Sequence, residues 1–106
     1  MKKKNEKAEQ HKIIVFESRK IRRIWHIEEW FFSVVDVCGA LTDQADDLKA
    51  RKYWNKLAQR LRAEGSELVT FCHQLKLEAA DGKNYITDCA NTEGMFRIIQ
   101  SIPSPK

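Results

Sequence analysis

Apolar residues recur along the chain with two different periods, and each change of period marks a new element. A short β-branched run predicts a strand at 12–18, and alternating residues predict a hairpin between 20 and 33. Glu28 and Glu29 are expected to form the tight turn of that hairpin. Trp25 and Trp30 fall at positions that predict inward-pointing core residues, as does Trp54 further along.

Three later segments have the spacing of amphipathic helices. The first follows Ser33, a candidate N-cap with Asp36 three residues on, as in a capping box. The second covers about 46–64, and Gly65 suits its end. Its predicted buried stripe comprises Ala50, Tyr53, Trp54, Leu57, Ala58 and Leu61. The third begins after Asn91 or Thr92, with the predicted apolar face Met95, Phe96, Ile98, Ile99 and Ile102.

Between the second and third helices the pattern returns to that of strands. Residues 68–72 and 73–77 are predicted to be extended, and 85–89 are predicted to return after a turn at Asp81-Gly82. The predicted order is therefore β-β-β, α, α, β-β, α. This order indicates an α+β fold in which small antiparallel hairpins pack on about three helices.

The length of 106 residues predicts one folded domain. We expect it to occupy residues 12–106, and we expect the lysine-rich residues 1–11 to be a disordered basic tail. No run without Asp, Glu, Lys or Arg is longer than eight residues, far too short to span a bilayer, and the N-terminus lacks a secretory signal. Three widely spaced cysteines favour reduced thiols, at least two of them buried, in a cytoplasmic protein.

The net charge of +4 is unevenly distributed. Most of the surplus lies in the first twelve residues and in 46–65, where six cations face three acids. Helical spacing places four of these cations on one face: Lys49, Lys52, Lys56 and Arg60. An uninterrupted row of cations is self-repelling, so it suits a partner with phosphates, although a solvated helix face is the alternative.

Two further basic positions extend this hypothesis. Arg22 and Arg23 lie on the first predicted hairpin, where they could contact phosphates or form ion pairs with Glu28 and Glu29. Lys83 and Asn84 lie at the tip of the second hairpin, which could act as a wing beside a DNA groove or be merely polar.

Catalytic chemistry has little support in the sequence. The chain contains no glycine-rich phosphate loop, nucleophile elbow or zinc-protease motif. Cys72 and His73 are neighbours on a predicted strand, so their side chains point to opposite faces. His26 and His73 are interpreted as isolated structural residues. The sequence therefore predicts neither an enzyme nor a cofactor or metal site.

Three stretches of the chain resemble a known family. "IWHIEEWFFSVVDVCGALT", "YWNKLAQRL" and "HQLKLEAADGKNYITDCANTEGMFRIIQSIPS" are similar to successive blocks of the BRO family N-terminal domain. That domain heads phage antirepressors, baculovirus BRO proteins and the DNA-damage-inducible protein D group. The resemblance runs from about Lys20 to the end of the chain.

This resemblance implies a compact α+β module that binds double-stranded DNA in a prophage-type or stress-linked regulator. In the family a variable C-terminal domain follows, so the chain is expected to be a fragment of a longer protein. The alternative is a protein-interaction module, an antirepressor head that binds a repressor or a recombination protein. The resemblance does not identify DNA contacts, so the candidate DNA-binding residues come from the charge pattern.

Overall fold

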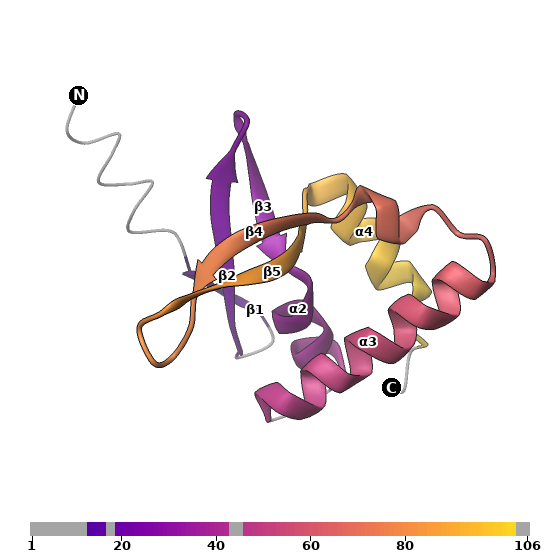
Figure 1. The fold of residues 1–106 in the computed structure, drawn as a ribbon, viewed down its shortest axis with the longest axis horizontal. Coiled ribbons are helices and arrows are strands. Elements are labelled where there is room, and N and C mark those ends of the chain that lie inside the picture. The colour runs from indigo at the N-terminus through magenta and orange to yellow at the C-terminus, as the bar shows by residue number, and fades with distance from the viewer. Residues whose placement is uncertain (1–12, 17–18, 43–45, 104–106) are drawn as a thin grey trace.

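The computed structural model describes residues 13–16, 19–42 and 46–103. The predicted tail, 1–11, lies outside the described residues. Within the described ranges the elements follow the predicted order, with one added 3-10 turn (Figure 1). They are β1 (Ile13–Phe16), β2 (Arg19–His26), β3 (Glu29–Ser33), α2 (Val34–Leu41), α3 (Asp47–Ala63), η1 (Leu68–Phe71), β4 (His73–Glu78), β5 (Asn84–Ala90) and α4 (Thr92–Ser101).

The described strands form one antiparallel sheet in the order β1-β2-β3-β5-β4. Two hairpins, β2–β3 and β4–β5, meet at only two residue pairs, Phe32–Ala90 and Ser33–Cys89. Arg22 Nη1 on β2 donates a hydrogen bond to the carbonyl of Glu78 on β4 at 3.1 Å, so the sheet curls and brings these two strands together. The α+β class predicted from the sequence is confirmed.

A polar side chain begins each of α2, α3 and α4, and the caps of α2 and α4 are ones that the sequence predicted. Ser33 accepts a hydrogen bond from the backbone N–H of Asp36 at the start of α2, and Asn91 accepts one from Gly94 at the start of α4. Asp46 does the same for α3, accepting from the N–H of Leu48. These caps satisfy N–H groups that have no partner within the helix.

Glycine ends α3 by a specific geometry. Gly65 has a φ of +76°, which a residue without Cβ adopts freely. Its N–H donates to the carbonyl of Arg62, and the N–H of Ser66 donates to that of Leu61. This pair of bonds is the Schellman motif, and it confirms the predicted end of the helix.

The core lies between α3, α2, α4 and the sheet. Trp54 is only 2% exposed, and its Nε1 donates to Asp88 Oδ2 on β5 at 2.8 Å, so α3 is fixed to the sheet by both packing and a hydrogen bond. Tyr53 is only partly buried. The rest of the predicted stripe is buried: Ala50, Leu57, Ala58 and Leu61.

Three sequence predictions about local structure were wrong. The β2–β3 turn lies at Ile27 and Glu28, because Glu29 already pairs with His26. Residues 68–71 are a 3-10 turn rather than a strand, since Glu67 accepts hydrogen bonds from both the N–H and the hydroxyl of Thr70. Phe96, expected in the core, is exposed.

The predicted inward position of Trp25 was also wrong. Trp25 shares a face of β2 with the buried Ile21, yet it is 54% exposed. Trp25 lies four residues after Ile21, about 13 Å further along β2. At that distance it lies beyond the helices that cover Ile21. Trp30 is only half-buried, so only Trp54 of the three tryptophans is a core residue.

Replacing Trp54 with Ala should lower the free energy of unfolding by roughly 3–5 kcal/mol, because a large core side chain and its bond to Asp88 are lost. Trp25→Ala is the matched control and should cost no more than about 1 kcal/mol. Urea unfolding of both variants measures this difference, and equal losses would contradict the packing described here.

Cys38 and Cys89 are buried and Cys72 is partly buried, as expected for at least two of the three. Loss of water around each sulfur raises the pKa of all three thiols to about 12. Because the thiolate is the reactive form, iodoacetamide at pH 8 should leave them unmodified until the domain unfolds in urea. Peptide mass spectrometry checks this, and rapid alkylation of the folded protein would contradict it.

Candidate nucleic-acid interface

The predicted basic row lies on the outer side of α3. Lys49, Lys52 and Lys56 are exposed, and they form no ion pair with any residue that the structure describes. Arg60 differs from them, since its Nε lies 3.8 Å from Glu64 Oε2 and its Nη2 donates to the carbonyl of Ser101 at 3.3 Å. Three of the four cations are therefore available to an anionic partner, and Arg60 is only partly available.

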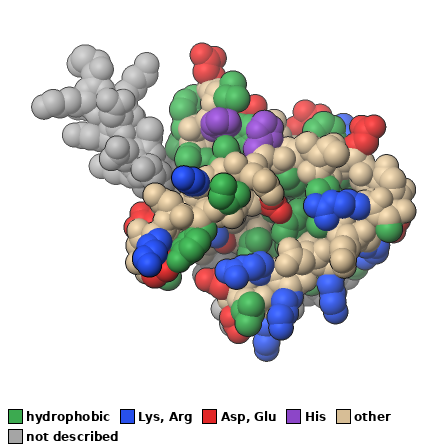
Figure 2. Space-filling view, in the orientation of Figure 1, with side chains coloured by type: hydrophobic (Ala, Val, Ile, Leu, Met, Phe, Trp, Pro, Cys, Tyr) green, Lys and Arg blue, Asp and Glu red, His purple; other side chains and the backbone are tan. Residues whose placement is uncertain are grey.

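Two more cations on α3 were left out of the sequence-based site. Arg51 and Arg62 are exposed and lie eleven residues apart, which is three helical turns, so they form a second line along the helix. The same helical spacing that identified the first row could have found them. Figure 2 shows Lys and Arg side chains along the outer edge of α3 and at the β4–β5 turn.

The β4–β5 tip carries mixed charge. Lys83 and Asn84 are exposed as predicted, but Asp81 lies beside them and accepts from the N–H of Lys83 at 2.9 Å and from the hydroxyl of Tyr85 at 2.6 Å. These two hydrogen bonds lower the pKa of Asp81, the Tyr85 bond contributing most. The tip is therefore ordered by its own hydrogen bonds, and Asp81 offsets the charge of Lys83.

The guanidinium of Arg22 forms its contacts within the domain. Its Nε and Nη2 bind the two carboxylate oxygens of Asp36 at 2.8 and 3.0 Å, and its backbone N–H donates to the same carboxylate. The hydrogen bond to Asp36 raises the pKa of the guanidinium. The pairing acid is thus Asp36 and not the expected Glu28 or Glu29. Fourteen positions separate the two partners, so no local pattern indicated the pair.

Arg23 lies on the opposite face of β2 from Arg22. Its guanidinium carbon lies 3.8 Å from the centre of the Trp30 ring, a cation–π contact. Partial burial lowers its pKa. Arg23 is therefore held against the hairpin surface beside Trp25, whose ring meets that of Trp30 edge-on at 5.3 Å.

The two strand histidines are not isolated. The rings of His26 and His73 lie 6.1 Å apart, and both pack against Phe31. The curl of the sheet brings them together from β2 and β4, which the sequence does not reveal. Among the described residues, no group of three or more His, Cys, Asp or Glu side chains could hold a metal ion.

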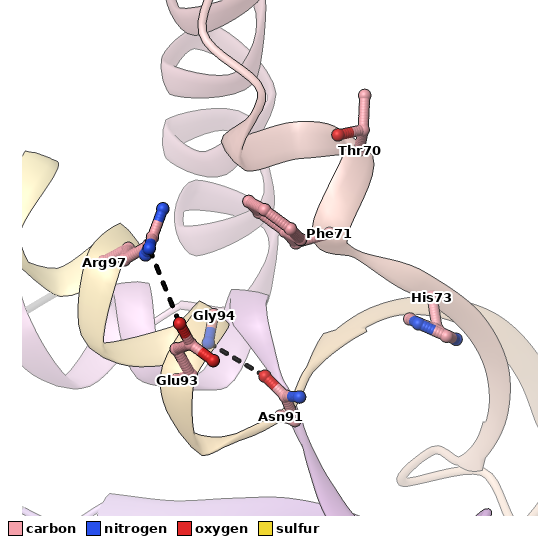
Figure 3. Close-up of a pocket in the computed structure, with 7 residues that line it drawn as sticks. All are labelled: Thr70, Phe71, His73, Asn91, Glu93, Gly94 and Arg97. Atoms are coloured by element: carbon pink, nitrogen blue, oxygen red, sulfur yellow. Dashed lines mark hydrogen bonds and ion pairs between the residues drawn. The ribbon is translucent and has the colours of Figure 1, made fainter.

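A hollow of about 230 Å³ lies beside His73, between η1 and the start of α4 (Figure 3). Its charged groups pair with each other, Arg97 with Glu93 at 3.5 Å, and Asn91 Oδ1 accepts from Gly94 N–H at 2.8 Å. Phe71 forms the opposite wall, with the Arg97 guanidinium 5.6 Å from its ring. The hollow therefore offers little surplus charge for a phosphate group.

Comparison with known families identifies the domain. The family model described as "BRO family, N-terminal domain" matches residues 20–106, most of the chain. The chain belongs to the BRO N-terminal domain family. No match was found among curated proteins or among solved structures. Membership of this family is consistent with a nucleic-acid or regulatory interaction. Within the described part of this BRO N-terminal domain, no helix is long and apolar enough to cross a membrane.

The position of Arg22 gives a test that separates a structural cation from a surface cation. Arg22→Met leaves the largely buried Asp36 carboxylate without its partner, so the free energy of unfolding should fall by roughly 1–3 kcal/mol. Lys49→Met, on the exposed row, should change it by less than about 0.5 kcal/mol. Urea unfolding curves measure both, and a stable Arg22→Met variant would show that the ion pair is dispensable.

Proposed function

We propose that this BRO N-terminal domain is the DNA-binding module of a prophage-type or stress-linked regulator. In this proposal α3 lies along the phosphate backbone of double-stranded DNA. The contacts are electrostatic and do not read sequence by themselves. The domain carries out no catalysis, needs no cofactor, and acts in the cytoplasm, where a phage or bacterial regulator meets its DNA.

The unpaired lysine row on α3 is the observation that carries the proposal. Lys49, Lys52 and Lys56 are exposed without acidic partners among the described residues. A helix that needs only solubility gains more from mixing acids into such a face, since neighbouring like charges are destabilising by a few tenths of a kcal/mol. A polyanionic partner removes that repulsion when it binds.

The dimensions of the row suit a duplex. From Lys49 to Arg60 the helix rises about 17 Å, which matches about five base-pair steps of 3.4 Å each. Burial of Trp54 and its bond to Asp88 fix the helix on the sheet, so the row is presented in one orientation. Lys83 and Asn84 on the β4–β5 tip are proposed as secondary contacts. Arg23 lies against Trp30 on the β2–β3 hairpin and is not proposed as a contact.

Reversing two charges of the row tests the proposal. If four phosphates are contacted, the slope of log K against log salt for an arbitrary duplex should be about −3.6. Lys52→Glu combined with Lys56→Glu should weaken binding strongly and reduce that slope to about −1.8, because two contacts are lost. Fluorescence anisotropy with a labelled duplex at several salt concentrations measures both quantities.

The matched control is Arg51→Glu combined with Arg62→Glu, which makes the same change of charge on the other flank of α3. It should weaken binding less than the lysine reversal. Both variants should keep their free energy of unfolding within about 1 kcal/mol, because all four positions are exposed. If the lysine reversal leaves affinity and salt slope unchanged, the row is a solvated face and the proposal is wrong.

A further inference from the structure

The tip of the β2–β3 hairpin lies at the end of the domain away from α3 (Figure 1). It exposes apolar side chains. Trp25 is 54% exposed and Ile27 is 71% exposed, and Trp30 beside them is only half-buried. We call Trp25, Ile27, Glu28 and Trp30 the hairpin tip. Figure 2 shows apolar side chains on this hairpin with acidic ones at its end. Single exposed apolar residues are ordinary, but three adjacent ones on a projecting element indicate a contact surface.

The backbone of the hairpin tip is unfavourable for its residues. Ile27 and Glu28 have φ values of +50° and +62°. A two-residue turn with both φ positive favours Asn-Gly, whereas a β-branched residue in that region is a genuine outlier. Ile27 gains little from packing in return, because most of its side chain is exposed. The fold alone therefore does not account for isoleucine here.

The charges on the hairpin tip decide between classes of partner. Glu28 is exposed and forms no ion pair with any described residue, and Glu29 accepts only a 3.3 Å hydrogen bond from the Asn91 amide. Two adjacent acids repel phosphates, so DNA and anionic lipid surfaces are poor partners for this end of the domain. A protein surface with Lys or Arg beside apolar residues complements it.

The shape of the hairpin tip also limits the partner. It is a narrow projection, so two copies meeting tip to tip would bury much less than the roughly 1,200 Å² of a specific interface. A partner with a cleft can surround the two strands and the exposed rings, and can bury far more area.

We propose that the hairpin tip is a docking site for a second protein, one whose apolar cleft is bordered by Lys or Arg. Trp25 and Ile27 enter the cleft, and Glu28 pairs with the basic border. Because this surface is separate from α3, the proposal does not depend on DNA binding, and the domain can hold DNA and protein at the same time.

The test uses a library of random disulfide-constrained 12-residue peptides selected against the wild-type domain. Enriched peptides should combine aromatic or aliphatic residues with Lys or Arg and should contain few acids. The decisive variant is Ile27→Asn with Glu28→Gly, which gives the turn its preferred residues while removing the apolar side chain and the acid. Peptide affinity should fall at least tenfold, although the melting temperature should rise by about 4–8 °C.

Trp25→Ser should lower peptide affinity in the same way. The matched control is Ile86→Asn, because Ile86 is the same residue type, is 61% exposed, and lies on the other hairpin. It should leave peptide binding unchanged. All three variants should keep the DNA affinity of the wild type.

Two peptide results would overturn the inference: the library enriches no peptide, or the enriched peptides bind the Ile27→Asn, Glu28→Gly variant as well as the wild type. Two further results would also overturn it: a concentration-dependent dimer that Trp25→Ser dissociates, or a loss of DNA affinity in Trp25→Ser. The last two would assign the hairpin tip to a second copy of the chain or to DNA. The DNA-binding proposal fails by a different result, namely unchanged DNA affinity and salt slope in the Lys52→Glu, Lys56→Glu variant. Failure of the docking proposal and failure of the DNA-binding proposal are therefore distinguishable.

Discussion

The guanidinium of Arg22 connects three elements that lie far apart in the sequence. It binds both oxygens of Asp36 on α2 and the carbonyl of Glu78 at the end of β4, and its Nη2 lies 3.4 Å from the hydroxyl of Ser33, which is fully buried. Ser33 in turn caps α2 and pairs with Cys89 across the narrow junction of the two hairpins. The curl of the sheet and the position of α2 thus both depend on Arg22.

That arrangement places the two surfaces of the domain at a distance from each other. α2 packs against α3 and α3 is bound to β5 through Trp54, so the cationic face is presented at one end. The β2–β3 hairpin extends away from α3 (Figure 1). Its far end exposes apolar and acidic side chains. The lysine row and the two acids of the hairpin end lie apart, so an anionic partner on the lysine row does not meet Glu28 and Glu29.

The sequence predicted those features that depend on neighbouring positions. The limits of α3 followed from periodicity and Gly65, and the exposure of Lys49, Lys52 and Lys56 followed from the helix geometry. The Arg22–Asp36 pair and the meeting of His26 with His73 depend on how distant strands curl, which no local pattern contains. Strand alternation correctly placed Trp25 on the face of Ile21. It could not show how far along β2 that face is covered by the helices.

The Arg22 bond to Glu78 also bears on aggregation. β4 is the last strand of the sheet, and its outer edge carries backbone groups without a strand partner. Since Ala79 N–H bonds to Lys83 across the hairpin, the carbonyl of Glu78 points to that open edge. Arg22 occupies the edge at this end of β4 by its hydrogen bond to that carbonyl. An exposed flat edge is a template for strand pairing between molecules, so the residue that holds the fold together also blocks such pairing at the Glu78 end of β4.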